Sequence, residues 1–252
     1  MQVMAFEPGG YRFIKGVFQY SAGVAAMPGY RLVRVRFHSP VPLADGFARV
    51  RTVIESAGRP LTAFAACELR SPAPFTEDGF RAFNEIYVGT LERWGIFDGT
   101  LNPVARSNVC PEIAPPAEPS FHAFTYTEEA PQAAPSCAIA GSGEAEEGHA
   151  NYRDHIVRLD DVSDEGMREK ARWVLGEMER RLGALGFSWA DVTATQLYTI
   201  RDVHPFLADE IVGRGAAAHG LTWHYCRPPV IGLEYEMDCR VTAVERTIAR
   251  TI

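Results

Sequence analysis

The sequence predicts an α+β fold built from two similar units. In each unit an amphipathic helix, a glycine and a short turn lead into a strand. A second amphipathic helix, an arginine-bearing segment and a closing strand then follow in the same order. Two further strands precede the first helix of each unit, which gives the order β-β-α-β-α-β-β. Elements in this order predict a mixed sheet with two helices packed on one of its faces.

The first unit shows this order over its whole length. Its strands are expected within residues 11–26, 30–37, 60–71, 102–109 and 120–127. The first helix carries an apolar stripe at helical spacing and ends at Gly58, which fits a C′ glycine. The second helix is expected over residues 76–95. Arg106 lies in the segment 102–109, among residues typical of a buried strand, where an unpaired guanidinium is costly.

The second unit repeats the pattern about one small domain later. Its strands are expected within residues 136–143, 151–159, 191–200 and 232–244. The first helix begins after Ser163, a good N-cap residue, and ends at Gly186. The second helix is expected over residues 203–220. Arg227, in the segment 223–230, is expected to occupy the place equivalent to Arg106.

A stretch rich in proline, alanine and acidic residues separates the two units and resembles a linker. The boundaries predicted on this basis are residues 1–127 for the first unit, 128–136 for the linker and 137–252 for the second unit.

Composition limits the classes of function. The chain has 252 residues, 46% of them apolar, and a net charge of −7 without a basic run, which argues against nucleic acid as a partner. Five cysteines without a CxxC spacing predict reduced thiols and a cytoplasmic protein. The first residues lack the features of a signal peptide, and no apolar run is long enough for a transmembrane helix, so no membrane is expected as a partner.

Three segments of the first unit carry a family resemblance. "QYSAGV" (19–24) is similar to a "PYSQAV" segment, "FNEIY" (83–87) to a "VNxxY" helix motif, and "PVARSNV" (103–109) to a "PARSxV" signature. All three motifs are those of the RidA (YjgF-type) reactive intermediate deaminases. Residues 185–202 and 232–241 of the second unit resemble the same family more loosely. Among two-unit members, the whole chain is most similar to bacterial 2-aminomuconate deaminases.

The resemblance implies a tandem duplication of a chorismate-mutase-like (RidA) unit. It also implies rings of three units with active clefts between neighbours, so that three two-unit chains would fill two rings as a homo-oligomer. The implied activity is hydrolysis of an enamine or imine acid, such as a 2-aminomuconate-type diacid, to a 2-oxo acid and ammonia, with neither a metal nor a cofactor. Two alternatives stay open: a carboxylate-binding or sensing protein without turnover, and a relative of chorismate-processing enzymes.

The resemblance also implies roles for single residues. Arg106 would hold a small carboxylate substrate, since a guanidinium offers two parallel donors to a carboxylate; the alternative is an ion pair with a local Asp or Glu. Asn84 and Tyr20 correspond to cleft residues of the family, with an exposed helical Asn and an ordinary core Tyr as their alternatives. Asn108 belongs to the same signature as Arg106 and is a further candidate for substrate binding.

The sequence offers two candidates for the catalytic acid or base. The family uses a glutamate on its last strand, but the closing strand of the first unit (120–127) has no acidic residue, and His122 is the only group on that strand that titrates below pH 8. Glu236 of the second unit aligns with the family glutamate. The catalytic candidates are therefore Glu236 and His122, assisted by Asn84.

Two arginines are candidates for the second carboxylate of a diacid. Arg227 is one, although two prolines follow it. Arg70 is the other, and a surface pair between Glu68 and Arg70 is its favoured alternative because both side chains point to one face of a strand.

Two further features carry no site in this interpretation. The glycine-rich, acidic stretch 141–148 lacks a phosphate-binding motif and is expected to be an exposed loop. The histidines, His149 and His155 among them, show no recognised metal spacing and are expected to be scattered.

Overall fold

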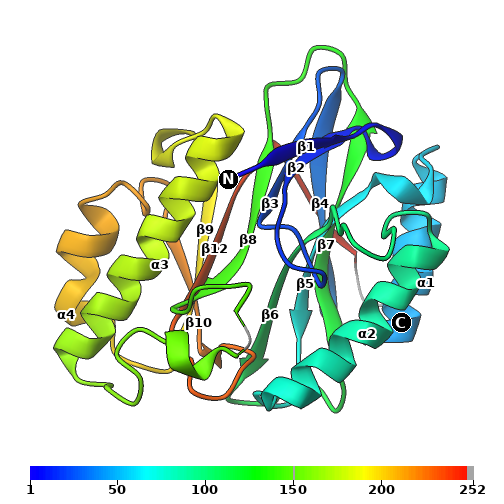
Figure 1. Cartoon of the computed structure of the whole chain (residues 1–252). Helices are drawn as coiled ribbons and strands as arrows, with labels where there is room; N and C mark the ends of the chain where they lie inside the picture. The colour runs from blue at the N-terminus through cyan, green and yellow to red at the C-terminus, as the bar shows by residue number, and fades with distance from the viewer. Residues whose placement is uncertain (150, 249–252) are drawn as a thin grey trace.

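Two mixed β-sheets form the protein, and helices cover the outer face of each (Figure 1). The computed structural model describes residues 1–149 and 151–248. Helices α1 (Leu43–Ser56) and α2 (Glu77–Arg93) cover the first sheet, and α3 (Asp164–Leu185) and α4 (His204–Phe206) cover the second. The predicted α+β class, with two helices over each of two sheets, is confirmed.

The first sheet has six strands. In spatial order they are β11 (Cys226–Arg227), β6 (Ala105–Pro111), β5 (Phe64–Arg70), β7 (Ser120–Glu129), β4 (Tyr30–Pro42) and β13 (Val244–Ile248). The second sheet has seven. They are β1 (Val3–Phe6), β2 (Tyr11–Ile14), β3 (Gly23–Ala26), β8 (Cys137–Gly143), β12 (Glu236–Val241), β9 (Ala194–Tyr198) and β10 (Leu221–His224).

The duplication is visible in the strand order. The central four strands of the first sheet run β6-β5-β7-β4, and those of the second run β10-β9-β12-β8. In each set the first two strands are parallel and the other neighbours are antiparallel. Both units are therefore copies of one topology, as the repeated element order predicts.

The two units also exchange strands. From the first unit, β3 pairs with β8 and so brings β1 and β2 into the second sheet. From the end of the chain, β13 pairs in parallel with β4 of the first sheet. The inner faces of the sheets meet, because the Gln196 Nε2–H donates to Glu68 across them at 3.2 Å. Because the two inner faces meet, side chains of both units line the same clefts.

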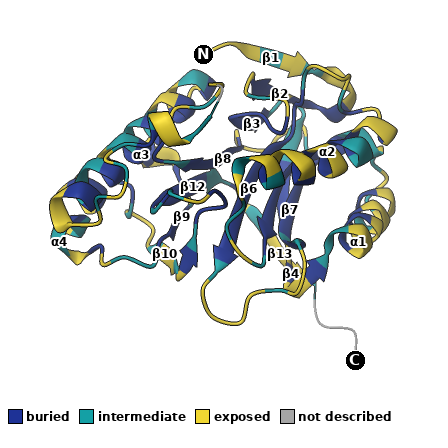
Figure 2. Cartoon of the chain, turned by 60° about the horizontal axis from the view of Figure 1, so that its bottom comes forward, coloured by how far each residue is buried: buried dark blue, intermediate teal, exposed yellow. Residues whose placement is uncertain are grey.

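The helices begin and end where local chemistry dictates. The Thr76 hydroxyl caps α2 by accepting from the Gly79 N–H at 3.1 Å, and Ser163 caps α3 in the same way. Gly186 ends α3 with φ of 84°, a left-handed conformation that glycine adopts without strain. The outer faces of α1, α2 and α3 are largely exposed and the strands beneath them buried (Figure 2).

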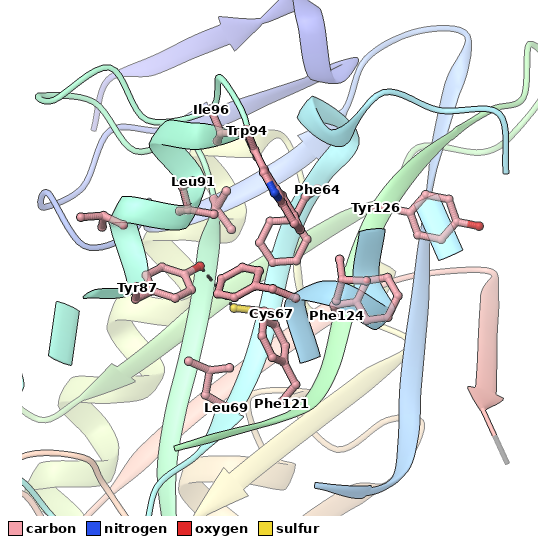
Figure 3. Close-up of a cluster of buried hydrophobic side chains, with 14 of the residues drawn as sticks. Phe64, Cys67, Leu69, Tyr87, Leu91, Trp94, Ile96, Phe121, Phe124 and Tyr126 are labelled. Atoms are coloured by element: carbon pink, nitrogen blue, oxygen red, sulfur yellow. Dashed lines mark hydrogen bonds between the residues drawn. The ribbon is translucent and has the colours of Figure 1, made fainter. Parts of the chain in front are cut away.

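The core under α2 is rich in aromatic side chains (Figure 3). Tyr87 of α2 lies with its hydroxyl 3.4 Å from the Cys67 sulfur of β5. Phe47 packs edge-on against Trp94 and Phe121, with ring centroids 5.2 and 4.9 Å apart. This packing fixes α2 against the sheet, and with it the side chains that α2 presents to the neighbouring strand β6.

Two predictions of secondary structure are wrong. Residues 151–159 form no strand: the Asn151 side chain accepts from the Asp154 N–H at 2.9 Å, and a 3₁₀ turn follows over Arg153–His155. Such local bonds compete with strand pairing. The helix expected over 203–220 is short, since α4 ends at Phe206 and a π-helical turn, Leu207–Val212, continues it.

All five cysteines are buried free thiols. Among the described residues, no helix combines the length and the apolar character that a membrane crossing requires.

Candidate active site

Arg106 lies in a cleft to which both units contribute. Strand β6 supplies Arg106 and Asn108, β8 supplies Gly141, and the start of β12 supplies Glu236. The cleft encloses about 420 Å³ of empty space, part of it open to solvent.

The Arg106 guanidinium is surrounded by aromatic rings and lacks an acidic partner. Its carbon lies 5.2 Å from the ring centroid of Tyr20 and 4.8 Å from that of Tyr87, and Phe80 and Phe83 lie within 5.6 Å. Rings at this distance favour the cation but accept none of its in-plane N–H bonds. Both terminal nitrogens are buried and have no hydrogen-bond partner among the described residues. The alternative of a local ion pair for Arg106 is therefore wrong.

Other unpaired polar atoms gather around Arg106. Six of the eight buried side-chain nitrogen and oxygen atoms without a partner in the described chain belong to Gln19, Asn84, Arg106 and Asn108. Asn84 is fully buried, which excludes the alternative of an exposed helical residue. Gln19 and Asn84 line a hollow that adjoins the Arg106 cleft, since Phe80 and Tyr152 border both. Buried polar groups are normally paired, so this concentration of open donors and acceptors indicates a ligand site.

Glu236 reaches the cleft from the second unit with a buried carboxyl group. Burial raises its pKa well above the usual value, and repulsion from Asp238 adds to the rise. The raised pKa favours the protonated form, which can donate a proton. A Cβ atom at Gly141 would lie only 2.2 Å from the Glu236 Oε1, so a glycine at this position leaves room for the carboxyl group.

The stretch 141–148 is not the exposed loop that was expected. Glu144 is fully buried and pairs with the equally buried Lys170 at 3.2 Å. Its carboxyl group also accepts from the backbone N–H groups of Glu234 and Tyr235, at 2.6 and 3.0 Å. These bonds hold the start of the loop against β12 and direct the residues that follow into the cleft.

Glu147, at the end of this stretch, is a site residue that sequence reasoning missed. Its Oε1 accepts from the Tyr20 hydroxyl at 2.9 Å and from the Arg181 Nη2 at 3.2 Å. Burial, followed by the charge of Glu147, raises the pKa of Tyr20 well above its usual value, so the phenol stays protonated and donates to Glu147. Gln19 was missed as well, although it stands directly before Tyr20 in the "QYSAGV" segment.

His122 lies outside the Arg106 cleft. It is on the inner face of β7, with its ring centroid 6.1 Å from that of His224, and both rings line a separate hollow. Burial, followed by the charge of Arg70, lowers the His122 pKa to about 3. The structure therefore does not support His122 as a proton-transfer group beside Arg106.

The two arginines considered for a second carboxylate lie elsewhere. Arg227 is on β11 rather than on β10, the strand equivalent to β6, so the expected equivalence with Arg106 is wrong. Its guanidinium pairs with Glu112, at 2.7 and 3.1 Å. Arg70 is buried over the Tyr198 ring and does not line the cleft. Glu68 pairs with Arg34, at 2.6 and 2.8 Å, so the expected pair between Glu68 and Arg70 is also wrong.

Two of the histidines are not scattered. His149 and His155 stack with their ring centroids 3.7 Å apart, and each of them and Glu146 offers one ligand atom within 4.8 Å of the others. The rings are only 13° from parallel, so their in-plane lone pairs run side by side instead of meeting at one point. A shared metal ion would require one ring to turn.

Comparison with solved structures identifies the fold. The structure is similar to that of a chorismatase, with a TM-score of 0.57 and 14% identity over 90% of this chain and 79% of the other. It also matches a YjgF/YER057c/UK114 family member from Mycobacterium tuberculosis, with a TM-score of 0.30 and 19% identity over 43% of this chain and 79% of the other. The protein thus has the two-unit α+β fold of the chorismatase.

Sequence comparison then gives the family. The model of the family described as 2-aminomuconate deaminase CnbZ matches residues 3–246. A 2-amino-5-chloromuconate deaminase from Comamonas testosteroni is 54% identical over 247 residues, which cover 97% of this chain and 98% of the relative. The chain belongs to the CnbZ family of 2-aminomuconate deaminases, and the resemblance to two-unit deaminases is confirmed.

Proposed function

We propose that the protein is a deaminase that hydrolyses 2-aminomuconate-type acids to the 2-oxo acid and ammonia, and that the Arg106 cleft is its active site. The observation that carries the assignment to this cleft is the buried Arg106 guanidinium, whose two terminal nitrogens have no partner among the described residues. A substrate carboxylate would satisfy both nitrogens at once. The family membership of the chain supports the activity itself.

Arg106 would bind the carboxylate next to the reacting carbon. The enamine first tautomerises to the 2-imino acid, which is already an electrophile. The guanidinium then holds the carboxylate and draws electron density from the adjacent C=N carbon, which favours attack by water. The aromatic rings around Arg106 exclude bulk water and so strengthen this electrostatic effect.

Glu236 and Glu147 would divide the proton transfers. Protonated Glu236 donates to the imine nitrogen while Glu147, held by Tyr20 and Arg181, positions the attacking water and accepts its proton. The carbinolamine formed then breaks its C–N bond and releases ammonia. Water supplies the carbonyl oxygen and two of the hydrogens of ammonia, so the reaction is a hydrolysis and needs no redox partner.

The far end of a diacid would lie in the adjoining hollow. Asn84 and Gln19 present unpaired amide atoms there, and Arg81 lines the same space. The Asn84 Nδ2 then takes the place that Arg227 and Arg70 were expected to fill.

We further propose the assembly and location implied by the RidA resemblance. Three two-unit chains would form a cytoplasmic homo-oligomer, with the unit boundaries at residues 127 and 137. The alternative of a binding protein without turnover loses its main support, because Glu236 of the second unit lies in the same cleft as Arg106 and supplies the acidic group that the first unit lacks.

The proposal is tested by ammonia release from enzymatically generated 2-aminomuconate. Wild type should release ammonia faster than buffer, and Arg106→Met should abolish the excess. Arg227→Met is the matched control, since this arginine pairs with Glu112 outside the cleft and its loss should leave the rate unchanged. A wild-type rate equal to that of buffer, or equal rates for Arg106→Met and wild type, would refute the proposal. Chorismate, tested in parallel, should give no turnover.

A further inference from the structure

A second polar hollow lies between the inner faces of the two sheets. It encloses about 570 Å³ of empty space, part of it open to solvent, and shares no lining residue with the Arg106 cleft. Strands β4, β7 and β13 border it on one side and β9, β10 and β12 on the other. Its charged and titratable lining includes Arg34, Arg36, Arg240, Arg246, His122 and His224.

Positive charge exceeds negative charge in this hollow. Glu245 is the one carboxylate in its lining, against four arginines. It pairs with Arg240 at 2.6 Å and with Arg34 at 3.1 Å, while Glu68, behind the lining, pairs with Arg34. Arg36 has no ion pair among the described residues, and the Arg240 Nη1 is buried without a hydrogen-bond partner there. Arg36 is thus exposed and unpaired in the described chain, and Arg240, although it pairs with Glu245, keeps one N–H group open, so both can bind an anion.

The two histidines of the hollow are held neutral mainly by their burial. Burial, followed by the charge of Arg70, lowers the pKa of His122 to about 3 and that of His224 to about 4. Arg70 is itself 3% exposed, with its Nη2 unpaired in the described chain. Both imidazoles are neutral near pH 7, so each ring carries one N–H donor. The His224 Nε2–H donates to the Gln196 Oε1 at 3.2 Å, which leaves the His122 N–H for an anion. An anion bound in the hollow would reduce the electrostatic repulsion between the arginine side chains that surround the two histidines.

We propose that this hollow is a binding site for a small dianion, coordinated by Arg36 and Arg240 from opposite sheets. The shared chemistry is a compact group with several anionic oxygens, which a phosphate or a short dicarboxylate provides. Arginine binds such groups with paired, charge-assisted hydrogen bonds. Because its ligands come from β4 and β12, the site would also join the two sheets.

Calorimetric titration at constant ionic strength and pH 7 tests the proposal. Wild type is titrated with inorganic phosphate and, separately, with succinate, which distinguishes phosphate from carboxylate as the ligand. Arg36→Gln and Arg240→Gln should each weaken binding by about tenfold or more, because each removes a charge-assisted contact. Arg49→Gln, an exposed arginine on α1, should bind as wild type does, and Arg106→Met, in the other cleft, should keep the binding that Arg36→Gln and Arg240→Gln weaken.

A second measurement needs no variant. The imidazole resonances of His122 and His224 should shift saturably as the anion is added to wild type, while those of the exposed His219 should not. Two results would overturn the proposal. One is the absence of saturable heat and of histidine shifts with both anions. The other is loss of binding only in Arg106→Met, which would assign the anion to the active-site cleft and leave the proposed deaminase function intact.

Discussion

Replacing Glu236 by glutamine should stabilise the protein in alkaline solution while it abolishes turnover. The carboxyl group is buried and its pKa is raised, so the native protein keeps a proton that the unfolded chain loses above about pH 4.3. The contribution of Glu236 to the free energy of unfolding of wild type is therefore fully present below that pH. It falls as the pH rises from there toward the pKa of the group in the native protein. The loss is up to about 1.4 kcal/mol per pH unit.

Glutamine keeps the shape of the protonated acid but cannot ionise. The difference in free energy of unfolding between Glu236→Gln and wild type should therefore grow in favour of the variant between pH 5 and 8. Urea denaturation at four pH values measures it, and ammonia release on the same samples measures turnover. Glu85→Gln, which removes an exposed carboxylate of α2, is the control and should show a difference that is constant with pH. A constant difference for Glu236→Gln would refute the protonated, buried state of Glu236.

Three further expectations follow from the geometry. Gly141→Ala should reduce ammonia release strongly, because the new Cβ would lie 2.2 Å from the Glu236 Oε1. Gly176→Ala, on α3 with open space around it, is the control and should not reduce it. Equal rates for the two variants would contradict the position given to Glu236. Lys170→Met should lower the free energy of unfolding by about 3–5 kcal/mol at pH 7, because it leaves Glu144 buried without its cation, and an unchanged urea midpoint would count against this pair. Asn84→Leu should lower ammonia release with little loss of stability, since neither amide atom is bonded within the described protein; a large drop in the thermal midpoint with normal turnover would mean that Asn84 is structural.

Much of the fold could be predicted because local signals agree with it. The apolar stripes of α2 and α3, with Ser163 before α3 and Gly186 beyond it, predict those helices closely. The strand expected at 151–159 fails because hydrogen bonds between Asn151 and Asp154 close a turn there, and apolar content alone does not reveal such bonds. The exchange of β3 and β13 between the sheets depends on long-range pairing, which the order of elements does not specify.

The candidate site was predictable in part. The cost of burying Arg106, together with its motif, indicates a missing anionic partner. Tyr20 and Asn108 line the same cleft as Arg106, and Asn84 lines the adjoining hollow. The place of His122 could not be read from the sequence, because the direction of its side chain depends on the register of β7 with its neighbours. Glu147 lies three residues after Glu144, whose long-range anchor to Lys170 and β12 leaves no local signal in the sequence.

A crystal structure with a stable 2-oxo diacid tests the central claim most directly. A carboxylate of the ligand should lie at about 2.7–2.9 Å from both terminal nitrogens of Arg106. The 2-oxo carbon should then lie between Glu236 and Glu147, with the far carboxylate toward Asn84. A ligand bound elsewhere, with both Arg106 nitrogens still unpaired, would contradict the account.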